Sequence, residues 1–172
     1  GDLEFRLVEL EGGDLSTLGE TTTRGGDIEG VPSVGTPTQS HEVELAVGEQ
    51  GDFDRARADF EAGNYSAAAE KFSIFTQTYP DGPLSGLAHF LRGTALTELG
   101  DNEGAARAFL KSFSGQPNGE VADEALLGLG RALASLNQVN EACVTIGEIA
   151  VRFPNSELVQ QAETERQNLG CN

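Results

Sequence analysis

Residues 53–169 carry one sequence pattern three times, at a fixed step of 37 residues. Self-similarity at a period of 20–50 residues predicts a repeat protein, whose units cannot bury their apolar faces alone and therefore stack. The aligned positions include Gly63, Gly100 and Asn137; Ala68, Ala105 and Ala142; Phe72, Phe109 and Ile146; and Pro80, Pro117 and Pro154. This pattern constrains the fold more than any other feature of the chain.

Each unit predicts two helices. Helix A ends at Gly63, Gly100 or Asn137, because Gly and Asn most readily take the left-handed conformation at a helix end. Helix B follows and ends before the proline, which cannot continue a helix. We expect a repeat domain over 53–172, with units at about 53–82, 84–119 and 121–155 and a capping helix at 156–169.

Small and large residues alternate between the two predicted helices. The column of Ala68 allows helix B to approach helix A closely, and the column of Phe72 fills the space between units. A second small-residue column contains Ala56, Gly93 and Gly130. The first helix A departs from the pattern, because Asp59 stands where the other units have leucine, so we expect Phe60 to take over its packing.

The first 52 residues differ in composition from the repeats. Leu3, Leu7 and Leu10 have the spacing of a coiled-coil seam, which predicts a helix over 1–11, either a stray amphipathic turn or the end of a coiled coil. The Gly-, Thr- and Pro-rich segment 12–52 predicts a linker, because it cannot bury enough apolar surface to offset its ordering entropy. Within this linker, the alternating residues 43–47 predict a strand-like contact.

The formal net charge of −17 disfavours two classes of partner. An acidic surface repels nucleic-acid phosphates and anionic membrane surfaces, although it also simply promotes solubility. The sequence contains no apolar run of 18 residues, so we expect no membrane span. It begins at Gly1, which fits either removal of a signal peptide or a cut fragment.

The order Gly63, Tyr65, Ala68, Phe72 and Pro80 resembles the tetratricopeptide repeat, with a unit of 37 residues where 34 is usual. The resemblance implies an all-α superhelix of three helical hairpins with a C-terminal capping helix. It also implies a protein-binding role, because helices A line the inner face of such an array.

The order of a coiled-coil end, a polar linker and long repeats with "YPDGP" and "RFPNS" junctions resembles the YbgF/CpoB family of Tol-Pal system proteins. The resemblance implies a non-catalytic periplasmic protein that binds TolA and a bifunctional penicillin-binding protein. Such proteins coordinate outer-membrane constriction with septal peptidoglycan synthesis during cell division, and their coiled coil forms a trimer. The alternative is a structural repeat subunit of a larger cell-envelope assembly.

The two cysteines, Cys143 and Cys171, lie on either side of the turn at Pro154. An antiparallel pair of helices would bring them to the same end, which predicts a disulfide that joins the cap to the array. A disulfide would fit an oxidising compartment such as the periplasm. The alternative is one buried and one exposed thiol.

No catalytic or metal site emerges from the sequence, and no cofactor is expected. The only histidines, His41 and His89, cannot supply a metal cluster. The segment "GLGRAL" at 128–133 lacks the third glycine and the preceding strand of a dinucleotide fingerprint. Nothing in the spacing supports a nucleophile–base pair of Cys143 and His89. The sequence therefore favours a binding protein over an enzyme.

The candidate binding groove consists of helix A residues that the repeat register places on the inner face. The arginines among them suit a partner carboxylate, whereas the alternative assigns the apolar members to the core and leaves the arginines in solvent. The candidates are Arg57, Phe60, Phe90, Thr94, Thr97, Leu127 and Arg131.

Overall fold

The computed structural model describes residues 38–171, with side chains from Val47 onward. These residues form seven helices and no strand, which confirms the predicted all-α array. The predicted helix at 1–11 and the linker as far as residue 37 lie outside the described residues. The helices are α2 (Thr38–Glu61), α3 (Tyr65–Thr78), α4 (Ser85–Glu98), α5 (Asn102–Gly115), α6 (Ala122–Ser135), α7 (Val139–Arg152) and α8 (Val159–Leu169).

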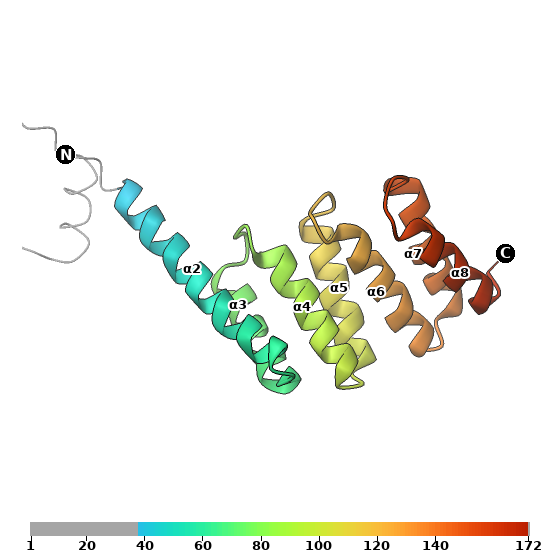
Figure 1. Ribbon diagram of the computed structural model, residues 1–172, viewed down its shortest axis with the longest axis horizontal. Helices are drawn as coiled ribbons and strands as arrows, with labels where there is room; N and C mark the ends of the chain where they lie inside the picture. Colours follow the sequence, from blue (N-terminus) through green and yellow to red (C-terminus); the bar gives the residue numbers. More distant parts are fainter. Residues whose placement is uncertain (1–37, 172) are drawn as a thin grey trace, which may run out of the picture. The chain divides into compact units, whose positions relative to one another are not determined.

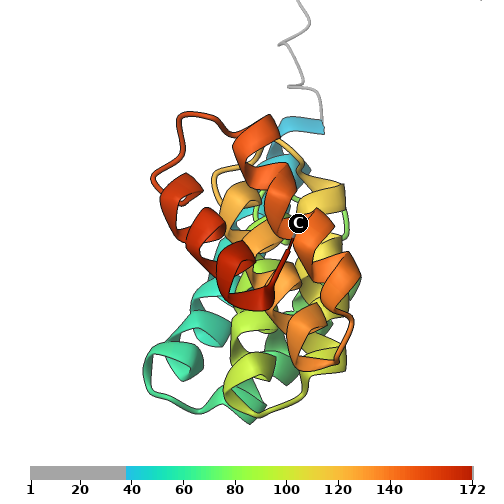
Figure 2. The same ribbon diagram turned by 90° about the vertical axis from the view of Figure 1, so that its right-hand side faces the viewer.

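The helices stack in sequence order as antiparallel hairpins. Each helix packs against the next one along the chain, and α4 also contacts α2 and α6 directly. Figure 1 shows α2, α4, α6 and α8 side by side in one layer, with α3, α5 and α7 behind them. Figure 2, viewed along the array from the C-terminal end, shows the same two layers. The A helices thus share one face of the array, as the repeat register requires.

The turns inside the hairpins follow the predicted left-handed positions. The backbone φ angles are +76° at Gly63, +77° at Gly100 and +62° at Asn137, whereas described residues elsewhere in these hairpins keep negative φ. In each turn, the residue after the left-handed one donates its backbone N–H to the carbonyl oxygen five residues earlier. Asp101 N, for example, donates to Leu96 O at 2.9 Å. The predicted ends of helices A are therefore confirmed.

The glycine column explains how closely the helices approach. A Cβ atom on Gly93 of α4 would lie 2.8 Å from the Phe109 ring of α5, and one on Gly130 would overlap the Ile146 side chain of α7. A Cβ on Gly128 of α6 would also lie 2.8 Å from the Phe109 ring. The ring of Phe109 therefore packs against a glycine on each of two neighbouring A helices, and this contact joins two consecutive units.

The N-terminal boundary of the array differs from the sequence-based expectation. Helix α2 begins at Thr38, so the linker does not extend to residue 52 and residues 43–47 are helical rather than strand-like. A tertiary contact is made within this extension, where the buried Glu49 carboxylate accepts a hydrogen bond from the backbone N–H of Leu84 at 3.3 Å, just before α4 begins. Composition could not predict this, because packing overrides the weak helix propensity of a glycine-containing segment.

Asp59, which replaces the leucine of the other units, has a charged partner on the neighbouring helix. Asp59 forms an ion pair with Lys71 of α3. This lysine, through its hydrogen bond, lowers the pKa of the Asp59 carboxyl. Phe60 packs instead against the first core cluster, with its ring edge-on to Tyr65 at 5.6 Å between centroids. The expectation that Phe60 supplies the apolar contact is confirmed.

Candidate functional site

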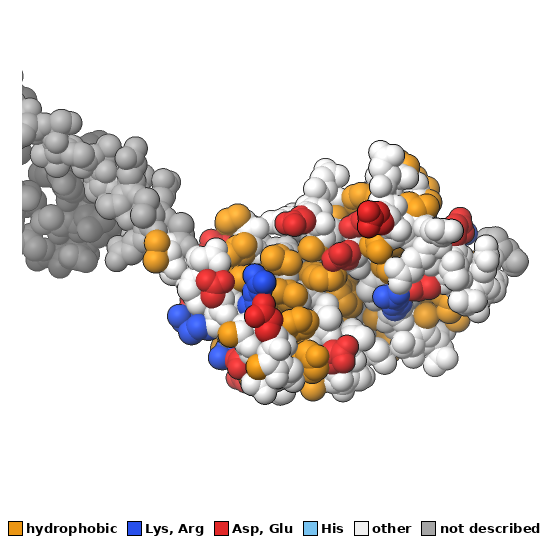
Figure 3. All heavy atoms as spheres, viewed as in Figure 1, with side chains coloured by type: hydrophobic (Ala, Val, Ile, Leu, Met, Phe, Trp, Pro, Cys, Tyr) orange, Lys and Arg blue, Asp and Glu red, His pale blue; other side chains and the backbone are white. Residues whose placement is uncertain are grey.

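A hollow opens on the A-helix face, between α4, α6 and α8. Side chains from these three helices line it, together with the Phe109 ring of α5 that reaches it between α4 and α6. The lining residues are Phe90, Thr94, Thr97, Glu98, Phe109, Glu124, Leu127, Arg131, Leu158 and Gln161. Figure 3 shows apolar side chains gathered across the middle of this face.

The hollow has an apolar floor and a polar rim. Phe109 and Leu127 are buried, each 4% exposed, and the Phe90 ring lies 5.8 Å from that of Phe109. Glu98 and Glu124 are exposed at the rim. This arrangement suits an apolar side chain from a partner surrounded by polar contacts.

Five of the seven predicted groove residues line this hollow: Phe90, Thr94, Thr97, Leu127 and Arg131. Leu127 is largely core, since it belongs to the third apolar cluster. Both threonine hydroxyls donate to carbonyl oxygens one turn back in α4, at 3.2 Å for Thr94 and 3.0 Å for Thr97. They are therefore satisfied locally and need no partner.

The other two predicted residues lie on α2 and do not line the hollow. Arg57 pairs with Glu61 in the same helix, with Nε 2.7 Å from Oε1. Phe60 packs against Tyr65. The inner face therefore provides a compact site over α4, α6 and α8 rather than one continuous strip of all seven residues.

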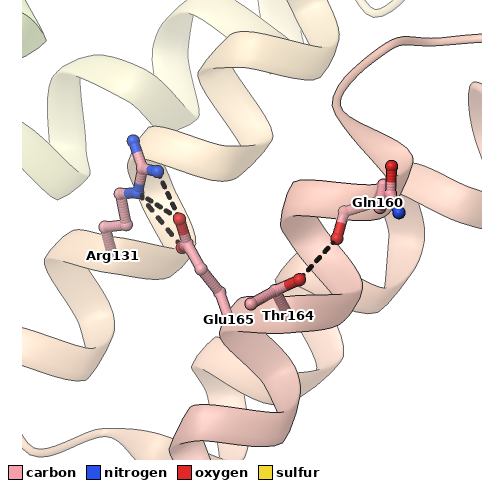
Figure 4. Close-up of polar contacts among 4 residues, drawn as sticks. All are labelled: Arg131, Gln160, Thr164 and Glu165. Atoms are coloured by element: carbon pink, nitrogen blue, oxygen red, sulfur yellow. Dashed lines mark hydrogen bonds and ion pairs between the residues drawn. The ribbon is translucent and has the colours of Figure 1, made fainter.

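The rim arginine is also paired within the chain. Figure 4 shows Arg131 of α6 pointing at the carboxylate of Glu165 in α8, while the neighbouring Thr164 donates to the Gln160 carbonyl at 2.9 Å. The Nε of Arg131 lies 2.9 Å from Oε1 and 3.1 Å from Oε2 of Glu165. Each arginine that we expected to meet a partner carboxylate thus already contacts a carboxylate of its own chain.

The acidic part of the rim was not among the residues predicted from the sequence. Glu124 and Gln161 occupy one repeat column, 37 residues apart, so the register could have placed both on the A-helix face. Although Glu124 is exposed, partial desolvation of its carboxyl, reinforced by the nearby carboxylates of Asp123 and Glu120, raises its pKa. A basic group from a partner would relieve this accumulation of negative charge.

The two cysteines lie at disulfide distance. Cys143 in α7 and Cys171 just after α8 have Cα atoms 5.6 Å apart and are joined through their sulfur atoms. The bridge closes the C-terminal hairpin at the end away from its turn. The capping helix is thus attached to the last unit both covalently and through the Arg131–Glu165 pair.

Within residues 38–171, no group of three or more His, Cys, Asp and Glu side chains is placed to hold a metal ion. In the same part of the chain, none of the helices combines the length and apolar character needed to cross a bilayer.

Comparison with known families identifies the repeats. Two family models, both described as tetratricopeptide repeat, match residues 53–120 and 124–156. Together they cover more than half of the chain, so the chain belongs to the tetratricopeptide-repeat proteins. Proteins of this class are typically non-catalytic modules for protein–protein interaction. No curated protein matches the chain as a relative.

Proposed function

We propose that the hollow between α4, α6 and α8 is the surface by which this repeat module binds a protein partner. The observation that supports this proposal most strongly is that five of the helix A residues predicted from the repeat register, from two units, line one hollow with an apolar floor. The conformation of the hollow is fixed by packing, because Phe109 is held between Gly93 and Gly128. A preorganised surface of this kind binds without a large ordering penalty.

The charges around the hollow define the partner segment further. Arg131 is neutralised by Glu165, whereas Glu98 and Glu124 have no paired cation among the described residues. The segment that fits best is therefore apolar with a Lys or Arg at its edge. An acidic segment would face like charges at this rim.

We further propose that the module belongs to the Tol-Pal system of the periplasm and coordinates outer-membrane constriction with septal peptidoglycan synthesis. The support is the order of coiled-coil end, linker and repeats in the sequence, together with a cysteine pair at disulfide distance, which suits an oxidising compartment. The partners would be a TolA-like protein and a bifunctional penicillin-binding protein. A coiled coil that precedes the repeats would set the oligomeric state, as a homotrimer.

The experiment is a capture assay with the full chain and the periplasmic domains of these two candidate partners. Thr97→Arg places a bulky cation at the exposed rim, and we expect at least a tenfold loss of affinity. Thr78→Arg is the matched control, since Thr78 is an exposed threonine of α3 with the same hydroxyl-to-carbonyl bond, 2.9 Å long. We expect this control to bind like the wild type.

Two other outcomes would contradict parts of the proposal. Unchanged capture by the Thr97→Arg variant would show that the hollow is not the binding surface. Failure of the wild type to capture either candidate partner would remove the Tol-Pal assignment. A stoichiometric complex purified from membranes would instead favour a structural subunit of an envelope assembly.

A further inference from the structure

A second hollow lies on a different side of α4, between the B helices α3 and α5. The side chains of α4 that line it, Ser85, His89 and Arg92, are spaced by four and three residues and so share one face of the helix. Phe90 and Thr94 of the same helix line the first hollow. Lys111 and Ser114 from α5 and Ser73, Thr76 and Gln77 from α3 also line the second hollow.

Among the side chains that the structure describes, this hollow contains the two cations that form no ion pair with a carboxylate. Residues 47–171 include nine Lys and Arg side chains. Seven of them form ion pairs within this part of the chain, namely Arg55, Arg57, Lys71, Arg107, Arg131, Arg152 and Arg166. The remaining two, Arg92 and Lys111, both line the second hollow, whose lining contains no Asp or Glu. The hollow is therefore a positively charged site on a chain whose net charge is −17.

Two polar atoms in the hollow have unused hydrogen-bonding capacity. The Nε of Arg92 and the Nδ1 of His89 are buried and have no hydrogen-bond partner among the described residues. A buried polar group without a hydrogen-bond partner destabilises the structure. An oxygen ligand bound in the hollow beside the Arg92 guanidinium would neutralise its charge.

The repeat provides an internal comparison at these positions. In the first unit, Asp52 and Arg55 occupy the columns of His89 and Arg92, and they form an ion pair with each other. In the third unit, Leu126 and Leu129 occupy the same columns and are buried. The fold therefore accepts an ion pair or two leucines here. Only the second unit has an arginine, Arg92, in one column and a histidine, His89, instead of a carboxylate in the other.

We propose that Arg92, Lys111 and His89 form a binding site for a carboxylate group carried by an acidic segment of a protein partner. The partner carboxylate would replace the one that Asp52 supplies to Arg55 in the first unit. Arg92 would hold its two oxygens in a forked contact, and Lys111 would contribute a second positive charge.

This site is separate from the hollow between α4, α6 and α8 and takes the opposite charge. The first hollow has carboxylates at its rim, whereas the charged side chains of the second are both cations, and its other polar side chains are the His89 imidazole, the Gln77 amide and hydroxyl groups. An acidic ligand therefore discriminates between the two sites. The test of one proposal is not affected by failure of the other.

The experiment measures binding of an end-blocked hexaglutamate peptide to the full chain by calorimetry at fixed ionic strength. We expect saturable binding to the wild type, no binding of hexaglutamine, and at least tenfold weaker hexaglutamate binding to Arg92→Gln/Lys111→Gln. The control Arg55→Gln/Arg107→Gln removes the same charge from exposed, paired arginines and should bind within twofold of the wild type.

A second variant, His89→Leu/Arg92→Leu, copies the third unit and should fold, as circular dichroism would show, yet lose binding. Absence of hexaglutamate binding to the wild type, or equal binding by the Arg92→Gln/Lys111→Gln variant, would overturn the site. Tighter binding of inorganic phosphate than of hexaglutamate, abolished by the same variant, would overturn the assignment to an acidic protein segment and indicate a free oxyanion.

Discussion

Arg131 of α6 and Glu165 of α8 form a forked ion pair across the last helix–helix contact of the array, with the arginine Nε within 3.1 Å of both carboxylate oxygens. The two residues are 34 positions apart, so the pair is a tertiary contact between the third unit and the cap. It also leaves the cationic charge at the rim of the first hollow neutralised. One interaction thus affects both the stability of the cap and the charge that a partner meets.

Removal of either partner should destabilise the cap by a modest amount. The Arg131 side chain is 51% exposed and that of Glu165 is 22% exposed, so solvent screens much of their attraction. We expect a coupling energy of about 1 kcal/mol in a double-mutant cycle of Arg131→Ala and Glu165→Ala, at the upper end for exposed pairs. Urea denaturation of the four proteins measures it. A coupling near zero would mean that the pair contributes nothing beyond its separate side chains.

The contact of Phe109 with two glycines gives a sharper prediction. Gly128→Ala should destabilise the fold by about 1–3 kcal/mol, because the new Cβ would lie 2.8 Å from the ring and overpacking costs this much. Helix propensity alone predicts the opposite sign, a gain of about 1 kcal/mol. Thermal and urea denaturation decide between the two effects.

A matched control and a suppressor make this test specific. Gly51→Ala in α2 adds the same methyl group where the nearest atom, Nη1 of Arg55, is 3.7 Å away, so we expect a small gain in stability. Phe109→Leu should cost less in the Gly128→Ala background than in the wild type, because the smaller side chain makes room. Equal and additive costs would show that the glycine and the ring do not interact as the structure indicates.

The repeat register predicted most of the fold because it reports tertiary packing directly. Residues that keep a step of 37 do so because each meets the same neighbour in its own unit, as Gly93 meets Phe109 and Gly130 meets Ile146. The same logic gave the left-handed turns at Gly63, Gly100 and Asn137. Both features depend on local or nearest-unit contacts that a single sequence records.

The features that the sequence did not predict involve contacts with segments outside the three repeated units. Helix α2 extends back to Thr38, and its Glu49 caps the start of α4, but no repeat column precedes the first unit to reveal this. The pairing of Arg131 with Glu165 involves the cap, and the repeat column of Glu165 holds Gly128 and Leu91 in the other units, so no earlier unit has an equivalent carboxylate. Composition and register carry no information about such single contacts. The hollow between α4, α6 and α8 was therefore only partly predictable.

The bridge between Cys143 and Cys171 should stabilise the last hairpin. For a sequence separation of 28, the chain-entropy model gives roughly 3–4 kcal/mol. We expect the Cys143→Ser/Cys171→Ser variant, or the reduced protein, to unfold at lower urea, with the loss greatest around α7 and α8 in hydrogen exchange. Mass spectrometry without reduction should find the chain two hydrogens lighter than its reduced form. An unchanged mass would contradict the bond and weaken the periplasmic proposal.

His89 should make the stability of the protein depend on pH. Burial, with added repulsion from Lys111 and Arg92, lowers the pKa of His89 to about 4 from the usual 6.5. Between these two values the unfolded chain binds the proton and the folded chain does not, so stability falls as the pH decreases from about 6.5 to 4. Because the side chain is only half-buried, we expect a loss of about 1–2 kcal/mol rather than the full value of the shift.

The variant His89→Leu isolates this effect from the carboxylates that titrate in the same range. Leucine occupies the equivalent position in the third unit, at Leu126, so the variant should fold. Urea denaturation at pH 4 and pH 7 should show a smaller difference in stability for the variant than for the wild type, with the wild type losing about 1–2 kcal/mol more because its unfolded histidine takes up a proton. Equal pH dependence in both proteins, or an NMR titration of His89 with a midpoint near 6.5, would show that burial does not hold this imidazole neutral.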